Sequence, residues 1–203
     1  MAGTITDPSA EQSPPVRRGR PPIGANRAAV LTATRELLAA EGYQRMTLEA
    51  VATRAGLYRR YIHRTWRSKA ELVRDALFDD VAAFRAPDTG SIESDVRELV
   101  AQHVDLITRP EFLRGLPGLQ GEFGTDPELW RETLDRHVGP PAAGFDAVLS
   151  RAMSRGEIED HVAPMVVLGT VSGALQHVAH LGLLGRDELI EHGVRLVLDA
   201  MVR

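Results

Sequence analysis

The chain of 203 residues has no cysteine, which excludes a disulfide framework and a zinc site built on cysteine thiolates. No apolar run approaches the roughly 20 residues that a membrane-spanning helix requires. The polar N-terminus also lacks the charged and then apolar segments of a signal peptide. These absences predict a cytoplasmic protein with no membrane partner. Apolar residues form 43% of the chain, which suffices for the core of one large domain or two small ones.

Lysine is almost missing as well, since Lys69 is the only one among 24 basic residues. A GC-rich genome produces the same arginine bias, so the abundance of arginine alone is weak support for DNA contact. The distribution of charge is more informative: residues 17–74 hold 13 basic and 4 acidic side chains, a net charge of +9, although the whole chain carries −4. A basic module on an acidic remainder predicts a DNA-binding head joined to a sensing or assembly domain. The alternative is a chance asymmetry on a solvated surface.

Residues 47–69, TLEAVATRAGLYRRYIHRTWRSK, contain two short helical patterns around a tight turn. Thr47 can cap the first helix with its hydroxyl, and Gly56 supplies the backbone freedom that the turn requires. The second helix is expected over residues 58–65. Its core-facing residues are Ile62 and Trp66, and its outward residues are Arg59, Arg60, Tyr61, His63 and Arg64. A helix that exposes such side chains is suited to a DNA major groove.

This stretch resembles the DNA-binding domain of TetR-type transcriptional regulators, whose pattern is Ala-Gly-Val, then Ser-Lys-x-Thr-Ile-Tyr-x-x-Phe/Trp, then x-Ser-Lys-x-x-Leu. The matching residues are Ala55, Gly56, Leu57, Ile62, Trp66, Ser68, Lys69 and Leu72, and in the preceding helix Val30, Leu31, Leu37, Leu38, Glu41, Gly42 and Tyr43. The chain departs from the pattern at three positions that face bases or phosphates, where Tyr58, Tyr61 and His63 replace Ser, Thr and Tyr. The resemblance spans about residues 26–85.

The resemblance implies an all-α protein of about nine helices in two parts. The head, at residues 24–86, is a three-helix helix-turn-helix domain, and the body, at residues 90–203, binds a ligand and dimerises through its last two helices. We expect base contacts from Arg59, Arg60, Tyr61 and His63, and phosphate contacts from Thr47, Tyr58, Arg64 and Lys69. Residues 1–23 are expected to form a disordered basic arm. Arg17, Arg18 and Arg20 in this arm either enter a minor groove or belong to an inert linker.

Helical periodicity also predicts the course of the chain. We expect helices at residues 26–40, with a stop at Gly42, and from a capping box at Ser68 to about residue 85. In the body, helices are expected at residues 92–108, from Asp126-Pro127 onward, and at 142–155, 163–184 and 187–201, with a broken stretch at 110–124. Gly139-Pro140-Pro141 is expected to break or kink its helix.

The helix at residues 163–184 is apolar on almost every side, so we expect it to face its own core and also a partner. Gly169 and Gly173 would let a second helix approach closely, and Val194 and Val197 are expected in the same dimer interface. The alternative is a core helix of a monomer. A homodimer also suits pseudo-palindromic DNA, because two identical heads read two half-sites.

The resemblance implies a ligand pocket in the body. The candidate pocket residues, each of which could instead be packed core or surface, are His103, Phe112, Leu116, Phe123, Trp130, Phe145, Gln176 and His177. A metal site made of His103, His177 and His180 is a weaker alternative, because no carboxylate has matching spacing. No nucleophile motif or phosphate-binding loop is present, so no catalytic residue, metal or cofactor is assigned.

The sequence therefore predicts a homodimeric transcriptional regulator that binds a pseudo-palindromic double-stranded DNA operator. It is expected to be a repressor that a hydrophobic small molecule, of unknown identity, releases from the DNA. Two alternatives stay open. The first is an effector-independent regulator or activator, which an apolar cavity in the body would count against. The second is an enzyme on a helical scaffold, which the basic head counts against.

Overall fold

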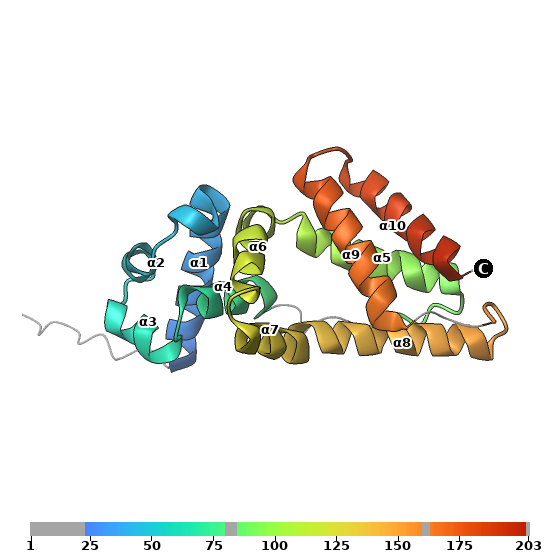
Figure 1. The fold of residues 1–203 in the computed structure, drawn as a ribbon, viewed down its shortest axis with the longest axis horizontal. Helices are drawn as coiled ribbons and strands as arrows, with labels where there is room; N and C mark the ends of the chain where they lie inside the picture. Colours follow the sequence, from blue (N-terminus) through green and yellow to red (C-terminus); the bar gives the residue numbers. More distant parts are fainter. Residues whose placement is uncertain (1–22, 80–84, 160–162, 202–203) are drawn as a thin grey trace, which may run out of the picture.

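The computed structural model describes residues 23–79, 85–159 and 163–201, and every regular element in these ranges is helical, as predicted (Figure 1). The head, at one end of the molecule, consists of α1 (Ile23–Arg45), α2 (Leu48–Arg54), α3 (Arg59–Thr65) and α4 (Lys69–Phe78). The body consists of α5 (Ile92–Ile107), α6 (Pro110–Phe123), α7 (Pro127–Thr133), the π-helical turn η2 (Leu134–Val138), α8 (Gly139–Ser154), α9 (Pro164–His180) and α10 (Arg186–Met201). The expected basic arm, with Arg17, Arg18 and Arg20, lies outside the described residues, apart from its last position.

Short-range signals explain why the head folds as it does. The Thr47 hydroxyl accepts a hydrogen bond from the Ala50 amide at 3.1 Å and so caps α2. Gly56 turns the chain toward α3 with a φ of 66°, a conformation that side chains other than glycine disfavour. The Ser68 hydroxyl accepts from the Glu71 amide at 3.1 Å and opens α4. These features confirm the predicted helix-turn-helix.

The predicted stop at Gly42 is a break inside α1, with φ of 78° and ψ of 173°, after which one more turn continues to Arg45. Arg114 of α6 lies against this break. Its Nη1 atom donates to the carbonyl oxygens of Ala39 and Ala40 at 2.8 Å and 2.9 Å. Carbonyl groups at a helix end lack partners within the helix, so the break in α1 gives the body a place to attach.

The expectation of a broken stretch at residues 110–124 is wrong, because α6 is a single helix that contains Pro117. A proline inside a helix removes one hydrogen bond and crowds the preceding turn. Burial of Phe112, Leu116 and Leu119 on one face of α6 offsets this penalty. Tertiary packing therefore overrides the local signal.

The helices α7, η2 and α8 follow one another without a gap. The disruption expected at Gly139-Pro140-Pro141 takes the form of the π-helical turn directly before it. The two prolines lie in the first turn of α8, where a missing amide hydrogen is tolerated. The result is one helical path that starts beside the head and runs along the body (Figure 1).

The last two helices lie beyond α6 as seen from the head, packed on each other and on α5 (Figure 1). Val194 and Val197 of α10 are only 3% and 4% exposed, because they pack in the core of their own protomer. The expectation that these two valines form a dimer interface is therefore wrong. The apolar residues that do reach the surface around α9 are Met165, Val166, Leu181 and Leu183.

Candidate DNA-binding surface and effector cavity

The outer face of α3 is the candidate DNA-binding surface. Ile62 is fully buried beneath it and Trp66, at the end of the helix, is also buried, so the helix has a fixed inner side. The exposed residues of this surface are Arg59, Arg60, His63 and Arg64, with Tyr61 half-buried. Tyr58, which directly precedes the helix, is 76% exposed. The predicted base-contacting residues therefore share one solvent-facing side of the head.

Each arginine of α3 has a partner on this surface. Arg59 donates from Nη1 to Glu49 Oε2 at 3.1 Å, and from Nε to His63 Nε2 at 2.9 Å. The guanidinium of Arg60 lies 5.0 Å from the centre of the Tyr58 ring. The same cation–π arrangement joins Arg64 to Tyr61 at 5.7 Å. Exposed contacts of this kind are weak, so a guanine edge or a phosphate can replace them.

Thr47 and Lys69, two of the predicted phosphate-contacting residues, differ in how freely their side chains can reach a phosphate. The Thr47 hydroxyl accepts from an amide to cap α2, but it keeps its own hydrogen for a phosphate oxygen. Lys69 Nζ instead lies 4.4 Å from the centre of the Tyr43 ring. Burial lowers the pKa of Lys69, while the charge of Glu122 opposes that shift. A phosphate would therefore compete with the ring for this ammonium group.

The body contains a cavity of about 320 Å³ between α5, α8, α9 and α10. Most of its wall is apolar, including Val96, Leu99, Val100, Leu106, Val167, Val171 and Leu175. Two predicted pocket residues, His103 and Phe145, line this cavity. Its other polar groups come from Gln102, Asp105, Arg109 and Ser172. Its volume and its lining are those of a site for a small apolar molecule.

His103 is the most distinctive polar group of this cavity. Its Nε2 atom is buried and has no hydrogen-bond partner. Burial lowers the pKa of His103 to about 4, so the imidazole is neutral at neutral pH. A neutral imidazole offers one donor and one acceptor, which suits a ligand with a single uncharged polar group.

A second cavity of about 310 Å³ lies mainly between α6 and α9. Four predicted pocket residues line it: Phe112, Leu116, Gln176 and His177. Phe123 and Trp130 line neither cavity. The centres of their rings lie 4.9 Å apart, and Trp130 is 41% exposed. The structure therefore distributes the predicted pocket residues over two cavities and one surface contact.

The alternative histidine metal site is not assembled, because His103 lines the first cavity whereas His177 and His180 line the second. Across the ranges that the structure describes, no three metal-binding side chains gather. None of the helices in those ranges has both the length and the hydropathy to span a bilayer.

Sequence reasoning missed the polar contacts that join head and body. Arg74 Nη1 of α4 donates to Glu132 Oε2 of α7 at 2.7 Å, and Tyr43 Oη donates to Glu122 Oε1 of α6 at 2.9 Å. The partners are 58 and 79 positions apart, and no periodicity links residues at such separations. One signal in the sequence could have indicated such a contact. Arg74 is a charged residue three positions before Leu77, on the side of α4 that is buried, and a buried arginine needs an acidic partner.

Comparisons with known proteins cover both parts of the chain. Residues 30–76 match the family described as bacterial regulatory proteins, tetR family, and residues 86–199 match the tetracyclin repressor-like C-terminal domain. The DNA-binding transcriptional repressor TetR of Mycobacteroides abscessus is 29% identical over 185 residues, which cover 87% of this chain and 93% of that protein. The crystal structure of the TetR family transcription regulator SCO0332 is 28% identical, with a TM-score of 0.65, over 88% of this chain and 99% of that one. The regulator FadR of Bacillus subtilis, solved with stearoyl-CoA, has the same fold at 12% identity, with a TM-score of 0.63 over 86% and 98% of the two chains.

Proposed function

Because this chain belongs to the TetR family of bacterial regulatory proteins, it is a DNA-binding transcriptional regulator, and we propose that it represses from a pseudo-palindromic operator as a homodimer. A hydrophobic small molecule in the cavity of about 320 Å³ releases it. The main support for this proposal is the arrangement of α3: Ile62 and Trp66 fix its inner side in the core, and its outer side presents three arginines to solvent.

The contacts of α3 suggest an order among the proposed base-reading residues. Arg60 is the strongest candidate for a guanine, because only the exposed ring of Tyr58 holds its guanidinium in the contacts seen here. Arg59 must leave Glu49 and His63 before it can reach a base. A bidentate arginine–guanine pair contributes about 1–3 kcal/mol of discrimination.

Selection of binding sites from a random DNA pool tests the DNA-binding proposal directly. We expect a pseudo-palindrome whose half-sites lie about one helical turn, ~34–36 Å, apart. Arg60→Ala should lose about 1–3 kcal/mol of binding free energy at one base position. Arg195→Ala, which removes an exposed arginine of α10, is the matched control and should bind as the wild type does. An unenriched pool, or an enriched site that Arg60→Ala binds with wild-type affinity and specificity, would count against the proposal.

The exposed side of α9 supports the proposed dimer interface. A Cβ atom built on Gly169 would meet nothing within 4 Å, so the backbone of α9 is open there to close approach by a helix. Val166, near the start of α9, and Leu181, directly after its end, are exposed by 56% and 53%. The double variant Val166→Glu/Leu181→Glu should be monomeric, because a dimer would have to bury unpaired carboxylates, which is unfavourable. Light scattering checks this, and a monomeric wild type would contradict the dimer.

The apolar wall and neutral His103 of the first cavity support an uncharged, largely hydrophobic effector. Such a ligand, bound only to the folded state, should raise the melting temperature with concentration and release the operator over the same range. Val171→Phe should abolish both effects by narrowing this cavity. Gln120→Leu, at the second cavity, should leave them intact. Hits restricted to polyanions or divalent metals would overturn this effector class, and a screen without any hit would favour the effector-independent alternative.

A further inference from the structure

A buried arginine joins the head to the body. The side chain of Arg74, in α4, is only 3% exposed. Its Nη1 atom donates to Glu132 Oε2 of α7 at 2.7 Å, and its Nη2 atom donates to Asp75 Oδ1 at 2.9 Å. A buried charge requires partners of opposite sign, and removing one partner of such a pair is strongly unfavourable. Arg74 therefore links α4 of the head to α7 of the body.

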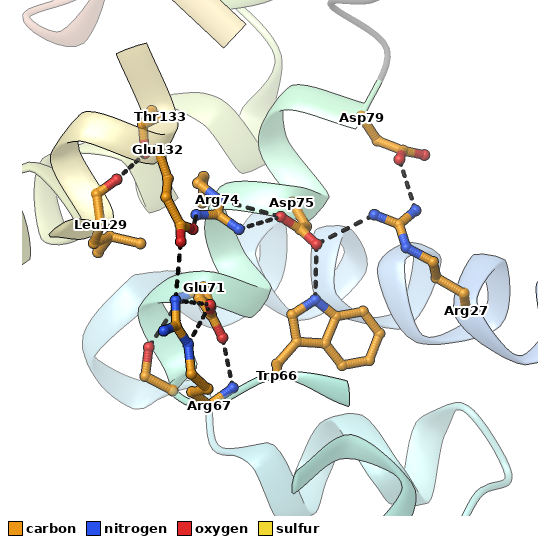
Figure 2. A network of polar contacts seen from close by, with 11 residues as sticks. Arg27, Trp66, Arg67, Glu71, Arg74, Asp75, Asp79, Leu129, Glu132 and Thr133 are labelled. Atoms are coloured by element: carbon orange, nitrogen blue, oxygen red, sulfur yellow. Dashed lines mark hydrogen bonds and ion pairs between the residues drawn. The ribbon is translucent and has the colours of Figure 1, made fainter. Parts of the chain in front are cut away.

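Asp75 extends this contact to the end of the recognition helix. Its Oδ2 atom accepts a hydrogen bond from the indole Nε1 of Trp66 at 2.9 Å and another from Arg27 Nη2 of α1 at 3.2 Å. Trp66 is the residue at which α3 ends. A continuous polar chain thus runs from Glu132 in the body through Arg74 and Asp75 to Trp66, directly after α3 (Figure 2).

Arg67, the next residue after Trp66, forms a second branch. Its Nη2 atom donates to Glu132 Oε1 at 3.1 Å, so each oxygen of the Glu132 carboxylate holds a different arginine. Arg67 is fixed at its other end by Glu71, which accepts from both the amide and the Nε atom of Arg67. Figure 2 shows the two branches meeting at Glu132. Arg67 is therefore held directly by a carboxylate of the body, and Trp66 is linked to the same carboxylate only through Asp75 and Arg74.

On the body side, Glu132 belongs to the helical path that also forms part of the cavity wall. Pro141 and Phe145 of α8 line the cavity of about 320 Å³, and only η2 separates α8 from α7. The ring of His137 in η2 stacks on that of Phe78 in α4, with 5.4 Å between the ring centres. This π-helical turn therefore also contacts the head. π-helical turns occur frequently at functional sites, and contiguous packed elements of this kind can carry coupling between sites.

We propose that Glu132 is a positioning residue whose carboxylate, held by Arg74 and Arg67, sets the orientation of α3 for operator binding. Withdrawal of Glu132, when the α7–η2–α8 path moves, weakens operator binding without detaching the head. This inference rests on the proposed function and adds the residue through which the body regulates the DNA-binding surface. The head stays attached because α6 holds α1 separately, through Arg114 and Glu122.

The test uses Glu132→Gln, which keeps the shape of the side chain and removes its charge. Glu128→Gln is the matched control, because Glu128 lies on the same helix, is 64% exposed and reaches Arg67 only at 3.9 Å. Both variants are made in a full-length parent that carries Trp130→Phe. The sequence has two tryptophans, so Trp66 is then the only one left. The readouts are the dissociation constant for the selected operator and the Trp66 emission of the free protein.

We expect Glu132→Gln to bind the operator at least about tenfold more weakly and to shift the Trp66 emission, with unchanged helicity and dimer content. Glu128→Gln should bind at least as tightly as its parent and leave the emission unchanged. Removing a negative charge by itself favours DNA binding, so a loss in Glu132→Gln cannot come from net charge. Glu132→Asp, which keeps the charge with a shorter reach, should fall between Glu132→Gln and the parent.

Parent-like affinity and emission in Glu132→Gln would overturn this inference, and so would an equal loss in Glu128→Gln. If the glutamine variant does not fold, Glu132→Asp decides instead, and parent-like affinity and emission in a folded aspartate variant would overturn the inference. Failure of the wild-type protein to select any DNA site would refute the proposed function itself, which separates the two outcomes.

Discussion

Two of the contacts between head and body, α6 with α1 and α7 with α4, differ in their chemistry. Where α6 meets α1 the helices are in close contact, because a Cβ atom at Gly118 would overlap the Tyr43 ring, and one at Gly115 would lie 3.2 Å from a methyl group of Leu38. Where α7 meets α4, the attachment depends on charge, with Arg74 held between carboxylates of the head and the body.

This difference suggests a division of roles. Close packing fixes the distance between two helices and responds little to pH or salt. Ion pairs depend on the protonation of each partner and can exchange one partner for another. We therefore expect the contact of α6 with α1 to act as a fixed pivot and the contact of α7 with α4 to change with the state of the body.

Arg74→Met should have the largest effect on stability, because it leaves Asp75 and Glu132 without their shared cation. We expect a loss of about 3 kcal/mol in the free energy of unfolding, measured by urea denaturation followed by circular dichroism. Arg67→Met is the matched control, since Arg67 also binds Glu132 but is 65% exposed. Its loss should stay below about 1 kcal/mol. Equal losses in the two variants would show that burial of Arg74 does not distinguish the two ion pairs.

Gly118→Ala should have the next largest effect and acts on the other attachment. The added methyl group overlaps the Tyr43 ring, and such overpacking destabilises by about 1–3 kcal/mol. Gly121→Ala is the control on the same helix, because its Cβ atom would meet nothing within 4 Å. Alanine should there stabilise α6 by roughly 0.5–1 kcal/mol. Thermal unfolding of both variants checks the prediction, and a neutral Gly118→Ala would show that α6 and α1 can separate without loss.

The two attachments also show what could be predicted from the sequence. Thr47, Gly56 and Ser68 act through neighbours one turn away, so the helix-turn-helix follows from local pattern. The pairing of Arg74 with Glu132 joins residues 58 positions apart and depends on how whole helices pack. The same limit applies to α6, where burial outweighs Pro117.

The body also shows that the sequence does not determine how whole helices pack. Helical spacing places Val194 and Val197 on the apolar face of α10, but it does not tell whether that face meets its own core or a partner. The structure places both in the core. For the pocket, the sequence identified inward-facing residues such as His103 and Phe112, but it could not divide them between two cavities.

Lowering the pH should weaken the ionic attachment more than the packed one. The hydrogen bond from Arg74 is the main cause that lowers the pKa of Glu132. Burial raises the pKa of Asp75, but hydrogen bonds from Trp66 and Arg74 outweigh it, so that pKa is lowered too. Carboxylates with lowered pKa values stabilise the fold above their unfolded values, here 4.5 and 3.8, and this contribution disappears as the pH falls through the folded values.

The stability difference between wild type and Arg74→Met should therefore shrink as the pH falls from about 5 to about 3 and these carboxylates become protonated. His103, with a pKa of about 4, destabilises both proteins equally as the pH falls below 6.5, so its effect cancels in the difference. Urea unfolding at several pH values measures the change. The deficit of Gly118→Ala should change less over the same range, and a constant deficit for Arg74→Met would contradict the ionic character of the contact of α7 with α4.

Lys69→Ala should have the smallest effect and tests whether the packed attachment also takes part in DNA binding. The ammonium group of Lys69 lies over the Tyr43 ring, beside the contact of α6 with α1, yet the sequence pattern assigns it to a phosphate. If Lys69 reaches a phosphate in the complex, the dependence of log K on log salt should flatten by about one, with weaker binding to all sequences alike. Arg195→Ala, on α10, should leave the slope unchanged. An unchanged slope for Lys69→Ala, together with a loss of stability below about 1 kcal/mol, would assign Lys69 to the attachment alone.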